Sequence, residues 1–373
     1  MKVLFLTNIP APYRIAFFNE LGKLCNLTVA FEGNSATDRN RNWQTEMSKH
    51  FTVVFLNGIR LGTDKFFSSS VLKLLHQKWD AIVICGYSTP TAMLAIEYMR
   101  LKKIPFFLEV DGGLIHNDNP FKFGLKKHFI SAADGWFSSG KETIKYLVHY
   151  GATPEKIYEY PFSSLQKKDI LPQLPTPAQK QVLRQQLGIT EEKVLVSVGR
   201  FSYQRGYGKG YDMLMKAGEV LPRDVGIYII GDEATEEFIQ WRKIKNLTHV
   251  HFIGFQSKEN LQKWYQAADV FVLPTREDIW GLVINEAMAQ GLPIITTDKC
   301  VAGLELVKEG ENGCIIPAND VKALEQAMLK IFTQDCRKMG QKSLEFIKPY
   351  TIENMAQIHK EFLEKIGTPS KSI

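Results

Sequence analysis

Short apolar runs alternate with amphipathic stretches along the first half of the chain. Five mostly apolar runs have the composition of buried parallel strands, at residues 3–7, 27–31, 81–85, 105–110 and 135–138. Apolar residues recur at helical spacing in five further stretches, at residues 14–24, 68–77, 90–101, 122–132 and 141–150. Such alternation is typical of a parallel sheet with helices on both faces. The first half is therefore predicted to be a doubly wound α/β domain.

The same alternation restarts in the second half. Six apolar runs predict strands at residues 193–199, 226–231, 249–254, 270–274, 293–297 and 313–317. Between the halves, residues 161–177 are rich in Pro, Gln, Ser and Lys, a composition typical of a connection. We therefore predict two Rossmann-like domains, at residues 1–165 and 191–345. Residues 166–190 would form the linker between them, and residues 346–373 a terminal segment with an amphipathic helix.

The composition is that of a globular enzyme. The chain has 373 residues, of which 45% are hydrophobic and 23% charged, so that each of two domains can bury a core. The five cysteines are widely spaced and lack a C-x-x-C pair, which argues against a disulfide framework or a zinc site. The first apolar run is too short for a signal peptide, and no run approaches the length of a spanning helix. We expect a cytoplasmic protein.

Charge is unevenly distributed between the halves. Residues 1–150 carry 18 Lys and Arg against 12 Asp and Glu, whereas the rest of the chain carries 28 of each. The first domain should therefore favour an anionic partner. Residues 119–130 mix aromatic and aliphatic side chains with Lys and His, which favours a helix at the surface of an anionic membrane, on the inner face of the cell membrane. A helix that faces the core with a solvated basic side remains the alternative. Nucleic acid is not expected, since no recognition motif accompanies the charge.

A strand end, a glycine turn and a helix start lie close together after residue 270. The apolar run ends at Pro274, and helical spacing begins after Gly281. The free amides of Gly281, Leu282 and Val283 would form a helix N-terminus that can hold a phosphate. Glu286, more than one turn along, would reach hydroxyls beyond that phosphate. The alternative is that the acids here are solvated residues on a loop and a helix face.

The acids of this segment resemble the E-x7-E signature of the family 4 retaining nucleotide-sugar glycosyltransferases. The resemblance implies a GT-B fold: two Rossmann-like domains face a cleft, and a C-terminal helix crosses back to the N-terminal domain. It also implies that Glu286 binds the nucleotide ribose and that the first acid contacts the donor sugar. That first glutamate falls on Asp278, with Glu277 one place early. The sugar contact is therefore shorter by a methylene or is made by Glu277.

A second motif resembles the G-R-(loop)-K-G-x-D-x-L element of the same family. It starts at Gly199 and Arg200 and continues from Lys209 after a long loop, in which Arg205 offers a competing register. The resemblance implies that Arg200 and Lys209 neutralise the donor diphosphate. Fixed cations suit this role because a departing nucleoside diphosphate gathers negative charge in the transition state. Solvated loop cations are the alternative.

Two further loops resemble donor contacts of the family. Gly254 and Phe255 match a place where the backbone meets the nucleobase, although a plain turn after a strand would explain them as well. Gly303 lies in a segment that resembles the loop whose small residues admit donor phosphates.

The first domain is expected to bind the acceptor. Arg14 opens a predicted helix, where the helix dipole disfavours a cation, so an anionic ligand would relieve the mismatch. A salt bridge to Glu20 or to another loop is the alternative. By the resemblance, Asp111 stands where many relatives have a histidine and would contact the donor sugar. His116 could reach in instead. Gly112 and Gly113 would allow a sugar to approach, or serve simply as turn residues.

These observations predict a retaining glycosyltransferase that moves a sugar from a nucleoside diphosphate, UDP being favoured, to a hydroxyl acceptor. The acceptor would be a glycan or lipid-linked precursor of a bacterial surface polysaccharide. The resemblance implies front-face attack, and no metal or other cofactor is expected because Arg200, Lys209 and the amides near Gly281 would hold the diphosphate. A sugar-nucleotide epimerase of the same fold and a non-catalytic nucleotide-binding subunit are the alternatives.

Overall fold

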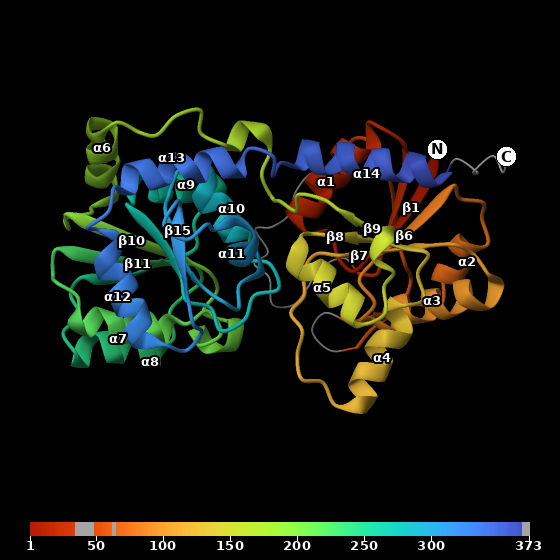
Figure 1. Ribbon diagram of the computed structural model, residues 1–373, viewed down its shortest axis with the longest axis horizontal. Helices are drawn as coiled ribbons and strands as arrows, with labels where there is room; N and C mark the ends of the chain where they lie inside the picture. Colours follow the sequence, from red (N-terminus) through yellow and green to blue (C-terminus); the bar gives the residue numbers. More distant parts are fainter. Residues whose placement is uncertain (34–47, 62–64, 368–373) are drawn as a thin grey trace. The chain divides into compact units, whose positions relative to one another are not determined.

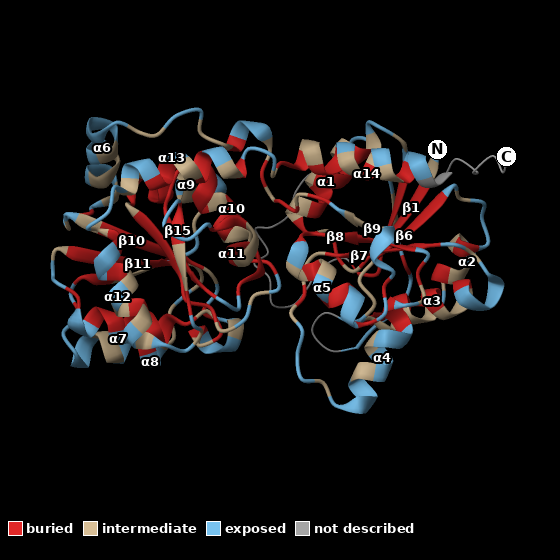
Figure 2. Cartoon of the chain, viewed as in Figure 1, coloured by how far each residue is buried: buried red, intermediate tan, exposed pale blue. Residues whose placement is uncertain are grey.

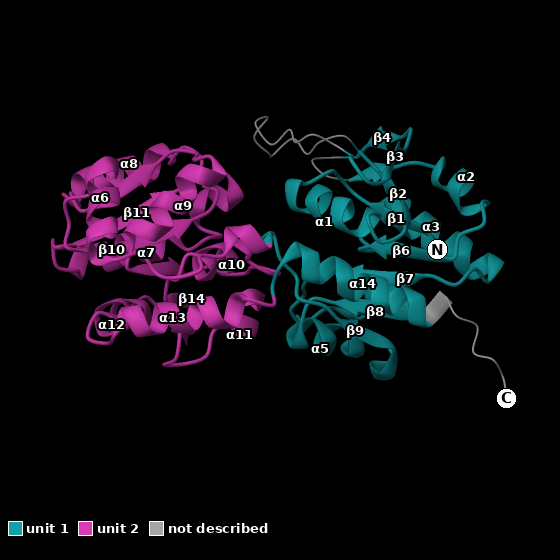
Figure 3. Ribbon diagram, turned by 90° about the horizontal axis from the view of Figure 1, so that it is seen from above, with its two compact units in different colours: residues 1–166, 350–373 teal, residues 167–349 magenta. Residues whose placement is uncertain are grey.

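The computed structural model describes residues 1–33, 48–61 and 65–367. The chain divides into two compact units (Figure 3). The first comprises Met1–Gln166 together with Tyr350–Ile373, and the second comprises Lys167–Pro349. The residues predicted to form the linker therefore lie mainly in the second unit. The last segment belongs to the first unit, from residue 350 rather than 346.

The described part of the first unit contains a seven-stranded sheet in which every pair of neighbours is parallel. From edge to edge its strands are β3 (Thr52–Phe55), β2 (Asn26–Phe31), β1 (Lys2–Thr7), β6 (Ala81–Cys85), β7 (Phe107–Val110), β8 (Gly135–Ser138) and β9 (Ile157–Glu159). A separate antiparallel pair joins β4 (Ile59–Arg60) and β5 (Phe66–Phe67). The five predicted strands of this half are present, and the sequence analysis missed the two edge strands, β3 and β9.

Helices cover both faces of this sheet (Figure 1). They are α1 (Pro12–Gly22), α2 (Val71–Leu75), α3 (Pro90–Lys102), α4 (Pro120–Ile130), α5 (Lys141–His149) and α14 (Ile352–Gly367). One core joins Leu4 and Leu6 of β1 to apolar residues of α2, α3, α5 and the end of α4. On the other face α1 packs against α14, and Phe5 of β1 contacts Phe17 and Phe18 of α1. The strand alternation of β1 thus supplies both cores.

The second unit repeats the plan. Its described residues form a six-stranded parallel sheet of β12 (Val250–Ile253), β11 (Val225–Ile230), β10 (Lys193–Val198), β13 (Val270–Leu273), β14 (Ile294–Thr297) and β15 (Gly313–Ile316). These are the six strands predicted from the sequence. The four inner strands are almost wholly buried (Figure 2), as expected for a parallel sheet covered on both faces, whereas the edge strands β12 and β15 are partly exposed.

Eight helices surround this sheet in the described chain. They are α6 (Pro177–Leu187), α7 (Tyr211–Val220), α8 (Glu236–Ile244), α9 (Lys258–Ala267), α10 (Leu282–Ala289), α11 (Val301–Leu306), α12 (Val321–Ile331) and α13 (Cys336–Ile347). Helices α7, α8 and α12 share one core, whereas α6 packs on α9 and α10 packs on α13. Helix α6 lies within the predicted linker. It begins with a capping box, in which Thr176 and Gln179 bond each other's backbone amides.

Parallel pairing places the carboxyl ends of all strands of a sheet at one edge. In each unit the loops that follow the strands therefore meet at that edge, which is where ligands bind to open α/β sheets. The predicted site residues lie in these loops or at the helix starts that follow them.

Candidate functional site

Lys209 and Asp278 form an ion pair at the carboxyl edge of the second unit's sheet. Nζ of Lys209 lies 2.5 Å from Oδ2 of Asp278, and the side chains are 17% and 15% exposed. Lys209 follows β10 and Asp278 follows β13, and these strands are neighbours in the sheet. The parallel pairing thus brings together the predicted cation of one motif and the predicted first acid of the other.

A second ion pair fixes the loops that carry these residues. The guanidinium of Arg276 donates to both carboxylate oxygens of Asp212, at 2.7 and 2.9 Å. The Arg276 amide and the Thr275 hydroxyl both donate to the carbonyl of Gly208, each at 3.0 Å. These bonds therefore attach the Lys209 loop to the loop after β13, at Gly208, the residue immediately before Lys209. The sequence analysis did not select Arg276, because nothing in its position signalled a partner in the other motif.

Helix α10 starts beside Asp278, as predicted. Its N-cap is Gly281 with φ +99°, and no side chain caps it. A Cβ at Gly281 would lie 2.8 Å from Sγ of Cys300 and 3.6 Å from Cγ of Asp278, so the turn leaves room only for glycine. The amides of Leu282 and Val283 lie in the first turn, where helix amides have no partner within the helix. An anion can therefore be bound here, directly beside the Lys209–Asp278 pair.

Glu286 lies one turn into α10 and is half-buried. Its Oε2 accepts a hydrogen bond from the hydroxyl of Tyr265 at 3.4 Å. Burial raises the pKa of Tyr265, and the Glu286 carboxylate raises it further, so this phenol remains a donor at neutral pH. Tyr265 thus orients the second acid of the motif.

The two arginines of the long loop differ in their surroundings. Arg200 is exposed, directly after Gly199. Arg205 is 76% exposed in its side chain, and its Nη2 lies 3.6 Å from Glu237 of α8. Both Gln204 and Arg205 have φ near +50°, which re-aims the loop at this point. Lys209 rather than Arg205 therefore lies against the motif acids in this structure.

The predicted donor glycines have different structural reasons. A Cβ at Gly199 would lie 2.7 Å from the Tyr211 hydroxyl and 3.3 Å from Cγ of Lys209, so this glycine makes room for the lysine stem. At Gly254 a Cβ would meet open space, and the neighbouring Phe255 is 46% exposed. Gly303 lies inside α11, where a Cβ would be 2.4 Å from Thr296. Close packing of α11 on β14 explains Gly303 without a ligand.

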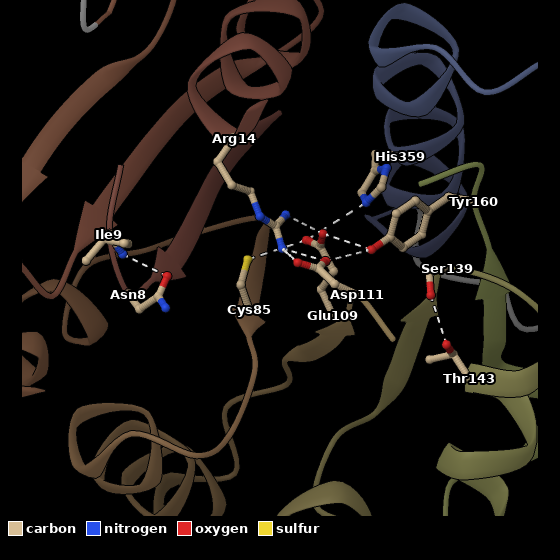
Figure 4. Close-up of polar contacts among 10 residues, drawn as sticks. All are labelled: Asn8, Ile9, Arg14, Cys85, Glu109, Asp111, Ser139, Thr143, Tyr160 and His359. Atoms are coloured by element: carbon tan, nitrogen blue, oxygen red, sulfur yellow. Dashed lines mark hydrogen bonds and ion pairs between the residues drawn. The ribbon is translucent and has the colours of Figure 1, made fainter. Parts of the chain in front are cut away.

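In the first unit the predicted residues Arg14 and Asp111 belong to one buried cluster (Figure 4). Nη1 of Arg14 lies 2.6 Å from Glu109, and Nη2 lies 2.6 and 2.7 Å from the two oxygens of Asp111. The Tyr160 hydroxyl donates to both acids, at 3.2 and 3.0 Å. His359 of α14 points at the same carboxylates, with Nε2 3.9 Å from Glu109. Of the alternatives for Arg14, the structure shows a salt bridge to another loop.

The electrostatics of this cluster follow from one cation between two acids, of which Glu109 is fully buried and Asp111 is 23% exposed in its side chain. Burial opposes ionisation of Glu109, but Arg14 and His359 outweigh it and lower the pKa of Glu109. Burial and the neighbouring Glu109 raise the pKa of Asp111, despite Arg14. Burial also lowers the pKa of His359. Glu109 therefore carries the charge that balances Arg14, and Asp111 is the carboxyl that more readily takes a proton.

The loop after β7 continues from Asp111. A Cβ at Gly113 would lie 2.8 Å from the ring of Tyr146, so this glycine is required by packing. Gly112 is half-buried and His116 is exposed. The sequence analysis missed Glu109, Tyr160 and His359, and only Glu109, a charge inside an apolar strand, carried a signal that could have revealed it.

The described residues also bear on metal binding and on membrane insertion. No group of three or more His, Cys, Asp and Glu side chains is arranged to hold a metal ion in this part of the chain. No helix in the same residues combines the length and the apolar character needed to span a membrane.

Comparison with known sequences gives a match to one family. Residues 192–334 match the family described as Glycosyl transferases group 1. D-inositol 3-phosphate glycosyltransferase of Xylanimonas cellulosilytica is 27% identical over 224 residues, 57% of this chain and 52% of the relative. Lipopolysaccharide core biosynthesis mannosyltransferase LpsB of Rhizobium meliloti is 34% identical over 161 residues, 40% of this chain and 45% of the relative. The chain thus spans about half the length of these relatives.

Solved structures share the whole architecture. The crystal structure of Anabaena HepE in complex with UDP superposes with a TM-score of 0.78 at 18% identity, covering 98% of this chain and 100% of the other. Together with the two parallel sheets this confirms the predicted two-Rossmann, GT-B type of fold.

Proposed function

We propose that the chain, whose residues 192–334 match the Glycosyl transferases group 1 family, transfers a sugar from a nucleoside diphosphate to a hydroxyl acceptor with retention of configuration. One observation carries the proposal: Lys209 is paired with Asp278, which lies beside the glycine turn that starts α10. A diphosphate at this place would meet a lysine and free helix amides together. Glu286 lies further along α10, where it would bind the ribose of the nucleotide.

The proposed reaction needs no enzyme nucleophile. The bond between the anomeric carbon and the diphosphate oxygen breaks, and the acceptor oxygen bonds to that carbon on the same face. The acceptor proton passes to the leaving phosphate oxygen. Lys209, Arg200 and the amides at the start of α10 stabilise the charge that gathers on the leaving diphosphate, so we propose that no resident metal is required.

UDP is the nucleotide we favour, since the solved structure of the same fold holds UDP. We further propose that the acceptor belongs to a bacterial surface glycan, since one relative acts in lipopolysaccharide core biosynthesis. We place the acceptor in the first unit, where Gly112, Gly113 and His116 follow β7.

The test compares transfer in variants of two site residues with a matched control. Release of UDP from a panel of UDP-sugars is measured with glycan acceptors for wild type, Glu286→Ala and Arg200→Ala. We expect kcat/KM to fall about 100-fold in each variant. Lys216→Ala, which removes an exposed cation on α7, should leave it unchanged. Transfer at the wild-type rate in both site variants would contradict the proposal.

The same assay separates the alternative functions. An epimerase would convert the UDP-sugar without an acceptor, and NMR of the recovered donor would show the new sugar. A non-catalytic subunit would bind UDP in a thermal-shift assay but would turn over no donor with any acceptor.

We also propose that the first unit docks on the cytoplasmic face of an anionic membrane through α4 and the end of α3. These helices touch, with Nη1 of Arg100 2.7 Å from His128. Most of α4 is exposed (Figure 2), including Phe121 at 81%, and Leu101 of α3 is 80% exposed. Lys102 and Lys103 follow Leu101 in the sequence, Lys122 and Lys127 lie on α4 with Phe121, and all four lysines are exposed. Such a surface suits anionic headgroups with apolar chains beneath.

Vesicle binding tests this contact. Co-sedimentation with phosphatidylglycerol vesicles should weaken about tenfold in Phe121→Ser, since one aromatic side chain no longer enters the bilayer. Ile244→Ser on the second unit, which removes a side chain that is 77% exposed, is the matched control. Equal binding of Phe121→Ser and wild type would contradict membrane docking through α4.

A further inference from the structure

We propose that Asp278 is the counter-ion and positioning residue of Lys209, and that it competes with the donor diphosphate for this lysine instead of contacting the donor sugar. The inference rests on the proposed function and assigns its first acid a different role. It starts from the 2.5 Å contact between Nζ of Lys209 and Oδ2 of Asp278.

The backbone of Asp278 is fixed on both sides. Its amide donates to the carbonyl of Lys299 at 2.8 Å, and its carbonyl accepts from the amide of Val301 at 3.1 Å. Its second carboxylate oxygen, Oδ1, accepts from the amide of Trp280 at 3.4 Å. Both oxygens therefore have donors, and the carboxylate is oriented by the loop that carries it. A carboxylate held in this way is suited to positioning its partner rather than to binding a ligand.

Lys209 is confined equally closely. Its stem passes Gly199, where a Cβ would lie 3.3 Å from Cγ of the lysine. Gly210 follows with φ +74°, and a Cβ there would lie 1.9 Å from the carbonyl oxygen of Pro274. The ring of Tyr203 lies 5.4 Å from the ammonium. The lysine stem is thus fixed, and its ammonium lies between a carboxylate and a ring face.

The pair is accessible enough to exchange partners. Each side chain keeps about a sixth of its surface exposed, at 17% and 15%. A diphosphate on the amides of α10 would lie beside Asp278, because Asp278 Oδ1 accepts from the amide of Trp280, directly before Gly281, and a Cβ at Gly281 would lie 3.6 Å from Cγ of Asp278. It would attract the same ammonium and repel the carboxylate. Asp278 therefore weakens ground-state binding of a diphosphate while it keeps Lys209 in place for the transition state.

The side-chain length at position 278 matters to this role. The resembled family has a glutamate here, with one more methylene. An aspartate keeps the carboxylate close to its fixed backbone, where Oδ2 lies 2.5 Å from the ammonium of Lys209. The proposal therefore leaves the sugar contact to another residue and predicts that removing the charge of Asp278 strengthens diphosphate binding.

Calorimetric titration with UDP, UMP and uridine tests the inference. We expect Asp278→Asn to bind UDP about fivefold more tightly than wild type, with uridine affinity unchanged. In a Lys209→Met background the same substitution should change UDP affinity less than twofold, because the competition needs the lysine. Glu325→Gln, an equal charge change on α12, should leave UDP affinity unchanged. In turnover, Asp278→Asn should lower both KM and kcat.

Each possible result either supports or overturns the inference. UDP affinity that is unchanged in Asp278→Asn overturns the inference, and so does a loss of affinity for UDP-sugars that spares UDP, which would mark a sugar contact. If Asp278→Asn does not fold, Asp278→Ser replaces it with the same expected gain. Wild-type protein that binds no UDP or UDP-sugar overturns the proposed function itself, so the two failures remain distinct.

Discussion

The two units place a cation against carboxylates at the same edge of similar sheets, but they do so at different depths. In the first unit Arg14 and Glu109 are 5% and 0% exposed in their side chains. In the second unit Lys209 and Asp278 are 17% and 15% exposed. The guanidinium of Arg14 bonds two carboxylates, those of Glu109 and Asp111, whereas the ammonium of Lys209 has one carboxylate and one ring face.

The burial of each ion group determines whether it can exchange partners. A buried ion group loses several kcal/mol when one partner is removed, so it keeps its partners and fixes its elements. A partly exposed pair costs little to separate and can give its cation to a ligand. The Arg14 cluster is therefore a structural anchor that presents Asp111, and the Lys209 pair is the exchangeable site.

The sharpest test of this contrast is Arg14→Met. The substitution keeps the side-chain volume but leaves Glu109 buried without its cation, and it removes the cation from the partly exposed Asp111. We expect the free energy of unfolding of the first unit to fall by about 3–5 kcal/mol, measured in urea. Lys23→Met, which removes an exposed pair with Glu20, is the control and should cost at most about 1 kcal/mol. A similar small loss in Arg14→Met would contradict the anchoring role.

Glu32 tests what happens when an acid at the same edge has no cation partner among the described residues. It is 3% exposed, accepts from the Thr89 hydroxyl at 2.6 Å, and burial raises its pKa from 4.5 to about 7. The folded state therefore holds this proton more tightly than the unfolded state. Stability contributed by the protonated form is present below pH 4.5 and is lost as the pH rises toward 7.

Glu32→Gln removes this titration and keeps an acceptor for Thr89. Between pH 5 and pH 8 the wild type should lose up to about 3 kcal/mol more unfolding free energy than Glu32→Gln. Measuring both proteins at both pH values cancels the other titrating groups, including His359, whose lowered pKa acts in the opposite direction. Identical pH profiles would contradict burial of a titrating Glu32.

The two sheets could be predicted from the sequence because parallel strands that are buried on both faces are continuous apolar runs. It missed β9, where Ile157–Glu159 is a half-buried edge strand, and it placed α6 in a linker because composition outweighed the capping signal of Thr176. In the site, motif spacing singled out Lys209, Asp278 and Glu286. Partners such as Arg276 and Glu109 were not foreseen, because 64 and 95 residues separate them from Asp212 and Arg14.

Lys209→Met has the smallest expected effect on stability and tests the exchangeable half of the contrast. Because the pair is partly exposed and Asp278 keeps the Trp280 amide, we expect about 1 kcal/mol or less to be lost without ligand. The same substitution should abolish most of the rise in melting temperature that UDP gives the wild type, since ligand stabilisation scales with affinity for the folded state. Lys216→Met, an exposed lysine on α7, should keep that rise. A large loss of stability in Lys209→Met without UDP would make this pair an anchor like the Arg14 cluster, and the contrast between the two units would then fail.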